Sequence, residues 1–147
     1  MSTRNRIEVM HGVNLDQLGR RPADHYGNLT LDQLEQKTEA WGHELGLNVR
    51  FFRTNSEGAF VEHLHRLDGM ADAVILNPGA WTHYSWAIRD ALEITDLPSV
   101  EVHLSDVSAR EPWRQVSVLE GIVSEVVSGQ GPEGYQSALQ VLAAKLK

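Results

Sequence analysis

The 147-residue sequence contains no cysteine. This absence excludes a disulfide framework, a zinc–thiolate site and a cysteine nucleophile. The sequence also lacks an apolar stretch of the roughly 20 residues that a membrane-spanning helix needs. Its first ten residues lack the apolar core of a signal peptide. We therefore expect a cytoplasmic protein that does not contact a membrane.

Basic residues are scarce, with 13 Lys and Arg against 20 Asp and Glu, for a net charge of -7. This balance disfavours nucleic acid as a partner, because phosphate contacts need a basic face. A small anionic substrate remains compatible, since it responds to local fields more than to net charge. The hydrophobic content of 41% is ordinary for a globular protein. The length predicts one domain over residues 1–147.

Short apolar runs alternate with helical patterns along the chain. We expect strands at 6–10, 47–52, 73–76, 100–103 and 122–127. We expect helices at 30–45, 56–68, 83–95 and 134–146, the first two capped by Thr30 and Ser56. This alternation favours a parallel sheet covered on both faces. The predicted fold class is α/β, a flavodoxin-like three-layer sandwich with a five-stranded parallel sheet.

The run from Ile75 to His83 is the most informative segment. Its apolar half predicts a buried strand, and Asn-Pro-Gly ends that strand because Pro lacks an N–H donor. Thr82 is then expected to cap a helix that begins near His83. Asn77 and His83 would lie at the carboxyl edge of the sheet, where open α/β sheets bind ligands.

A second polar group follows the fourth predicted strand. Period-2 alternation places Glu101, His103 and Ser105 on the same side of an extended segment. A carboxylate beside an imidazole orients the ring and favours its protonated form, which suits a general acid. The alternative is a buried polar ladder with a structural role.

The segment 11–29 has no clear periodicity and carries Arg20, Arg21 and Tyr26. A phenol, with a reference pKa of about 10, is a weak base, but a nearby guanidinium favours the phenolate. A mobile loop of this kind could close over an acid and bring in a base. A solvated loop without a function is the alternative, and spacing alone favours it.

Two apparent motifs do not fit their usual functions. Residues 129–134 match GxGxxG, but no second βα unit follows, and Glu133 would repel a phosphate. His63 and His65 point to different faces of a helix, so they form a poor metal pair. Neither a metal site nor a cofactor site is predicted.

Several longer motifs agree in order and spacing with one family. The chain resembles the type II 3-dehydroquinate dehydratases (type II dehydroquinases) from about residue 7 to residue 146. The motifs that carry the resemblance are Asn14-Leu15, Arg21, Tyr26-Gly27, Thr54–Gly58, Asn77–His83, Arg89–Ala91, Glu101–Ser105, Ala109–Glu111 and Gly134-Tyr135.

The resemblance implies dehydration of 3-dehydroquinate to 3-dehydroshikimate, in the shikimate pathway or in quinate breakdown, without metal or organic cofactor. It implies that Tyr26 is the base and that Arg21 holds its phenolate. Asn14 would position a water that stabilises an enolate, and His103, oriented by Glu101, would protonate the leaving hydroxyl.

The resemblance also assigns substrate binding and assembly. The side chains of Asn77, His83 and Arg114 would hold ring hydroxyls, and the backbone N–H groups of Leu104 and Ser105 would bind the carboxylate. Asp90 would reach the site of a neighbouring subunit. Family members form trimers that assemble into dodecamers, so a homo-oligomer is expected.

The chain departs from the usual family pattern around these motifs. The departures lie at His11, Val13, Pro22, Ala23, Arg53, Trp81, Tyr84, Trp86, Val116, Glu120, Val123 and Glu125. None of them removes a residue assigned to a proton transfer. Two alternatives to an active dehydratase are a family-derived binding or regulatory protein without catalysis and a dehydratase for a modified cyclic hydroxy acid.

Overall fold

A computed structural model describes residues 4–147. Its centre is one sheet of five parallel strands in the order β2-β1-β3-β4-β5. This order is that of the flavodoxin-like doubly wound sheets, so the predicted fold class is confirmed. The strands are β1 (Arg6–His11), β2 (Asn48–Arg53), β3 (Ala73–Asn77), β4 (Ser99–His103) and β5 (Glu125–Ser128).

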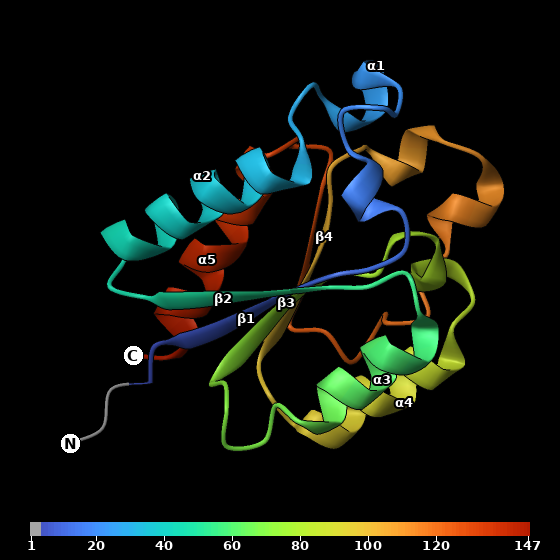
Figure 1. Ribbon diagram of the computed structural model, residues 1–147. Coiled ribbons are helices and arrows are strands. Elements are labelled where there is room, and N and C mark those ends of the chain that lie inside the picture. The colour runs from blue at the N-terminus through green and yellow to red at the C-terminus, as the bar shows by residue number, and fades with distance from the viewer. Residues whose placement is uncertain (1–3) are drawn as a thin grey trace.

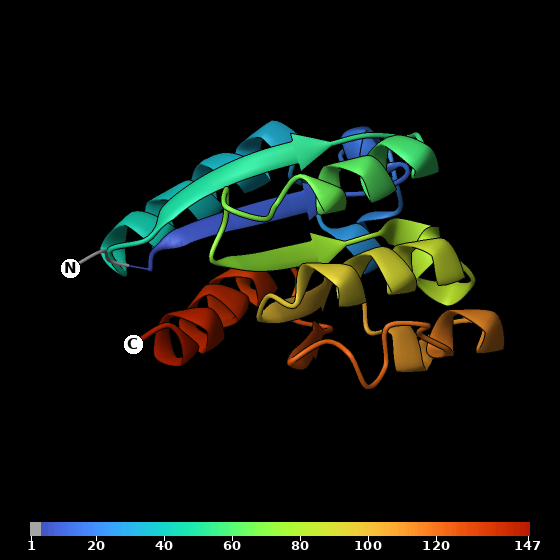
Figure 2. The same cartoon turned by 90° about the horizontal axis from the view of Figure 1, so that it is seen from below.

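Helices cover both faces of the sheet (Figures 1 and 2). The helices α2 (Leu31–Glu44) and α5 (Glu133–Lys145) pack on one face, and α3 (Glu57–His65) and α4 (Trp86–Thr95) pack on the other. Short α1 (Ala23–Tyr26) and the 3-10 turns η1 (Leu15–Gln17), η2 (Gly79–His83), η3 (Val107–Ala109) and η4 (Pro112–Gln115) lie in the loops. Within residues 4–147, no helix combines the length and apolar character needed to cross a membrane.

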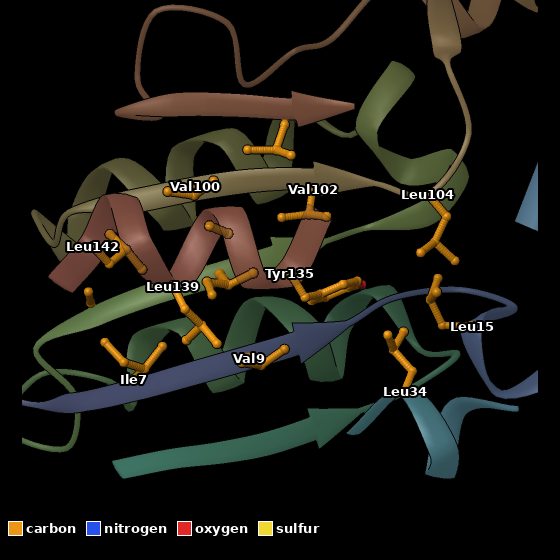
Figure 3. Packing of buried hydrophobic residues seen from close by; sticks show 14 of the residues in the cluster. Ile7, Val9, Leu15, Leu34, Val100, Val102, Leu104, Tyr135, Leu139 and Leu142 are labelled. Carbon is orange, nitrogen blue, oxygen red and sulfur yellow. The ribbon is translucent and has the colours of Figure 1, made fainter. Parts of the chain in front are cut away.

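Each face of the sheet has its own hydrophobic core. Ile7 and Val9 of β1 contribute to the core under α2 and α5, which Figure 3 shows from close by. Met10 of the same strand contributes to the core under α3 and α4. Because parallel sheets are covered on both faces, their strands are apolar along nearly their whole length.

The first two predicted helix starts are confirmed. Thr30 and Gln33 form a reciprocal capping box at the start of α2, and the Ser56 side chain accepts the N–H of Ala59 at the start of α3. These caps rest on contacts within four residues, which is why the sequence pattern alone reveals them.

The predicted helix from His83 to Thr95 is wrong at its start. The chain forms η2 up to His83, and α4 begins only at Trp86, with the Ser85 side chain accepting the N–H of Ile88 at 3.2 Å. Thr82 is buried inside η2 and caps no helix. The Pro-Gly turn thus leads into a tight turn, which holds His83 at the sheet edge.

The predicted fifth strand is also wrong at its start, because β5 begins at Glu125 instead of residue 122. Ile122 and Val123 are apolar for a different reason, since they pack against the core under α3 and α4. Likewise, the segment 11–29 is more regular than its lack of periodicity predicts, since it contains η1 and α1.

The ends of β1 and β3 approach each other closely at two glycines. A Cβ on Gly12 would lie 2.3 Å from the carbonyl oxygen of Pro78, and one on Gly79 would lie 2.6 Å from the carbonyl oxygen of Val13. Gly79 also has a φ of +66°, which favours glycine. This close approach brings the loops after the two strands together.

Candidate active site

The polar groups that follow the strands converge on one pocket at the carboxyl edge of the sheet. This is the edge at which open α/β sheets bind ligands. The pocket is lined by Val13, Asn14, Leu15, Arg21, Tyr26, Asn77, Gly79, Ala80, His83, His103, Leu104, Ser105, Val107, Arg110 and Arg114.

Tyr26 receives two guanidinium groups on its hydroxyl oxygen. Arg21 and Arg110 each donate an N–H to that oxygen at 2.7 Å. The Arg21 guanidinium also lies 3.8 Å from the centre of the Tyr26 ring. Because a guanidinium donates hydrogen bonds and cannot accept them, neither arginine accepts a hydrogen bond from the Tyr26 hydroxyl. Two positively charged groups therefore lie at this one oxygen.

His103 is held by a buried carboxylate behind the pocket. Its Nε2 lies 2.6 Å from Glu101 Oε2, and both side chains are almost fully buried. The other oxygen of Glu101 accepts the hydroxyl of Ser117 at 2.9 Å. With both carboxylate oxygens engaged, Glu101 fixes the imidazole ring. His103 thus has the arrangement of an oriented general acid or base.

His83 lies beside His103 at the end of η2. The two imidazole rings are stacked with centres 6.3 Å apart. His83 Nδ1 lies 2.7 Å from the carbonyl oxygen of Val116. Burial lowers the pKa of His83 below its ordinary value, and the nearby positive groups act in the same direction. The neutral ring is therefore favoured.

Asn14 and Asn77 are fixed by hydrogen bonds to neighbouring residues. Asn14 has a left-handed backbone with φ of 68°, and its N–H donates to the Asn55 side chain at 2.8 Å. Asn77 accepts the N–H of Gly79 at 3.1 Å and donates to the hydroxyl of Tyr135 at 3.4 Å. The Asn77 amide and the Asn14 backbone are therefore positioned before any ligand binds.

Tyr135 reaches this site from the core. It extends from α5 toward the carboxyl ends of the strands (Figure 3) and is fully buried. Burial raises the pKa of Tyr135 to about 12. It therefore remains a neutral hydroxyl that supports Asn77.

The pocket is locally positive in a chain with net negative charge. Arg21, Arg110 and Arg114 line it together with two imidazoles, while no carboxylate of residues 4–147 lies on its wall. Arg114 is oriented by Glu111, whose carboxylate it contacts at 3.0 Å. Such a local field attracts a small anion even when the whole protein is acidic.

The structure brings together most of the site residues predicted from sequence. Nine of them line the pocket: Asn14, Arg21, Tyr26, Asn77, His83, His103, Leu104, Ser105 and Arg114. Glu101 lies directly behind the pocket against His103. Asp90 does not line it; this residue is exposed on α4.

Arg110 and Ser117 are the residues that sequence reasoning missed. Arg110 belongs to a matching motif but had no assigned role, and its contact with Tyr26 spans 84 positions of sequence. Ser117 gives no local signal for its bond to Glu101. Asn55, by contrast, follows a predicted strand, and that position could have indicated its support of Asn14.

The fold is that of a doubly wound α/β protein, and its site has the groups that acid–base chemistry on a small anion requires. The site offers a phenol next to two cations and an imidazole next to a carboxylate. Among residues 4–147, no three His, Asp or Glu side chains are grouped in a way that could hold a metal ion.

The chain belongs to the class II dehydroquinase family, whose family model matches residues 5–143. A 3-dehydroquinate dehydratase of Pelobacter propionicus is 46% identical over 135 residues, which are 91% of each chain. A 3-dehydroquinate dehydratase of Thermotoga maritima is 44% identical over 97% of each chain. The crystal structure of type II dehydroquinase from Propionibacterium acnes superimposes with a TM-score of 0.91 at 39% identity, covering 98% of this chain and 99% of the other.

Proposed function

We propose that this chain catalyses the dehydration of 3-dehydroquinate to 3-dehydroshikimate, as a hydro-lyase of the shikimate pathway or of quinate breakdown. The observation that carries the proposal is the pairing of two groups across one pocket. Tyr26 is flanked by two guanidinium groups, and His103 is held by Glu101. Elimination of water next to a carbonyl needs such a base and such an acid.

In the proposed mechanism, the Tyr26 phenolate takes a proton from C2, and the electron pair moves into the C3 carbonyl to give an enolate. Arg21 and Arg110 favour the phenolate electrostatically, since both already contact the oxygen. Asn14 positions a water that donates a hydrogen bond to the enolate oxygen.

The enolate then collapses and expels the C1 hydroxyl. His103 donates a proton to that hydroxyl as the C1–O bond breaks, so water leaves and a C1–C2 double bond forms. Glu101 stabilises the imidazolium before the transfer and fixes its direction. At the end of the cycle Tyr26 carries the proton taken from C2, and His103 lacks the proton that left with the water. Proton exchange with solvent resets both groups.

Substrate binding is proposed to use the remaining pocket groups. The backbone N–H groups of Leu104 and Ser105 bind the carboxylate, as successive amides do in anion sites. Asn77, His83 and Arg114 hold ring hydroxyls. All five residues line the pocket, and its positive charge supports the assignment.

We also propose an assembly and a location for the protein. The chain forms a homo-oligomer, a dodecamer built from trimers, in which Asp90 reaches a neighbour's site; its exposure on α4 supports this. The protein acts in the cytoplasm, as one domain, without cofactor or nucleic-acid partner.

A direct assay tests the activity. Purified protein is mixed with 3-dehydroquinate, and the ultraviolet absorbance of the conjugated enone acid is followed without added metal. We expect absorbance to rise with time in proportion to enzyme. No new absorbance, with binding detected by calorimetry, would favour a family-derived binding protein. No absorbance and no binding would favour a modified cyclic hydroxy acid as the substrate. The exposed residues Trp86 and Tyr84 are unusual and would be examined first.

A further inference from the structure

Trp113 contacts two of the proposed substrate-binding groups from outside the pocket. It lies in η4 and is 48% exposed. Its ring centre is 5.3 Å from that of His83, with the planes nearly perpendicular at 87°. The Arg114 guanidinium lies over the face of the Trp113 ring, 4.1 Å from the ring centre. One exposed aromatic ring thus joins His83 and Arg114.

The hydrogen bond of His83 determines what this residue offers a ligand. A carbonyl oxygen only accepts, so Nδ1 of His83 carries the hydrogen that bonds to Val116. In the neutral ring, Nε2 then has a free lone pair. Neutral His83 is therefore an acceptor for a hydroxyl hydrogen, and protonation would turn the same atom into a donor.

Several groups around His83 keep it neutral. Burial lowers its pKa, and the charges of His103 on β4 and Arg114 on η4 add to this effect. The Val116 carbonyl and the Glu101 carboxylate act in the opposite direction. Trp113 is placed to support both of the lowering effects, because its ring contacts the imidazole and the Arg114 guanidinium lies over its face.

Packing alone does not explain Trp113. Neither of the two hydrophobic cores includes it, and half of its surface is exposed. Its contacts are instead with two residues that line the pocket.

We propose that Trp113 is a positioning residue that holds His83 as a hydroxyl acceptor and Arg114 at the pocket, and so sets affinity for a substrate with ring hydroxyls. This inference rests on the proposed function for its substrate. Its effect is on binding, because Trp113 touches neither Tyr26 nor His103.

The test compares Trp113→Ala and Trp113→Phe with Trp41→Ala. Trp41 is the matched control, since it also has a cation over its ring, Lys37, but lies on α2. Steady-state turnover of 3-dehydroquinate is measured between about pH 5 and 8, the range in which histidine changes charge. We expect Trp113→Ala to raise KM by about 5- to 30-fold with kcat nearly unchanged. The rise should be larger at the acidic end.

The conservative and control variants sharpen this result. Trp113→Phe keeps a ring and should recover most of the affinity, while Trp41→Ala should leave KM at its wild-type value. An unchanged KM for Trp113→Ala across the pH range would overturn the proposal. A fall in kcat by the same factor as the rise in KM, together with a lower melting temperature, would also overturn it, because that pattern indicates a structural role.

A second measurement does not depend on the substrate. The protonation of His83 is followed by nitrogen-15 NMR in the unliganded protein. In Trp113→Ala we expect the pKa of His83 to rise toward its ordinary value. An unchanged titration of His83 overturns the proposal even if the enzyme is active. A raised pKa supports it even if the wild-type protein does not turn over 3-dehydroquinate, a result that would count against the proposed function alone.

Discussion

At the residue scale, the most telling group is Tyr26, whose oxygen accepts hydrogen bonds from two arginines. Arg21 comes from the same loop, whereas Arg110 comes from the segment after β4. A phenolate formed between them gains from both charges in a partly buried site, where electrostatic interactions are stronger than in water. The proposed base therefore depends on residues from two loops.

Removing the Tyr26 hydroxyl should abolish most turnover. Tyr26→Phe keeps the ring on which the Arg21 guanidinium packs, so we expect the fold and the assembly to persist. A positioned base contributes about 10²- to 10⁴-fold to rate, and kcat should fall by this amount. The exposed Tyr84→Phe serves as the control. Wild-type turnover in Tyr26→Phe would refute the assignment of the base.

A second residue-scale feature joins two of the departures from the family pattern. His11 is buried with its Nε2 3.0 Å from Glu35, and Arg53 donates to the other oxygen of Glu35 at 3.1 Å. Burial alone would raise the pKa of Glu35, but His11 and Arg53 together lower it. The two unusual residues thus lie against one carboxylate.

The stability of the protein should depend on this carboxylate in acid. Because the pKa of Glu35 is lower in the folded protein, its stabilisation is present above the unfolded value and is lost as pH falls through the folded one. Glu35→Gln should cost about 1–3 kcal/mol at pH 7, since it removes the negative charge that accepts a hydrogen bond from Arg53 and lies beside His11. In urea unfolding, the difference in the free energy of unfolding between wild type and Glu35→Gln should shrink below about pH 4. A difference that is constant with pH would contradict the account.

At the element scale, the site depends on how closely the loops after β1 and β3 approach. Gly12 donates its N–H to the carbonyl oxygen of Asn77 at 2.8 Å, and a Cβ at Gly12 would collide with Pro78. Asn14 lies in the loop after β1, and Asn77 is the last residue of β3. Any separation of the loops therefore moves two pocket amides at once.

Gly12→Ala should damage both stability and activity. The new methyl would lie 2.3 Å from the Pro78 oxygen, and overpacking of this kind costs about 1–3 kcal/mol or more. Gly58→Ala is the matched control because it lies within α3, where a Cβ meets nothing closer than 4.0 Å. That variant should be as stable as wild type or up to about 1 kcal/mol more stable. Denaturant unfolding and the ultraviolet assay measure both effects; equal behaviour of the two variants would refute the role of the close approach.

At the scale of the whole molecule, the position of Asp90 bears on whether the site is built from one chain or shared between two chains. It is exposed on α4 and absent from the pocket of its own chain. An acidic side chain from a neighbour would complement a pocket with three arginines. The proposed assembly would therefore complete the site.

Mixing two inactive variants tests this arrangement. If Asp90 serves a neighbour, Asp90→Ala and Tyr26→Phe each lack a different part of a shared site. Unfolding and refolding them together at equal amounts should restore about a quarter of wild-type activity, because random assembly makes that share of sites intact. Light scattering should report the same oligomer for both. Mixed protein with no recovered activity would place Asp90 outside the neighbour's site.

The sequence by itself determined the alternation of strands and helices, the caps at Thr30 and Ser56, and the polar groups that follow each strand. Those features depend on periodicity and on contacts within a few residues, which are local. The tertiary structure decided the rest. Three contacts join segments that are distant in sequence: Arg110 with Tyr26, Ser117 with Glu101, and Trp113 with His83. Only the strand order and the loop conformations decide which of these segments meet. The predicted cap at Thr82 is also replaced by the tertiary structure. Thr82 is buried in η2, and Ser85 caps α4 in its place.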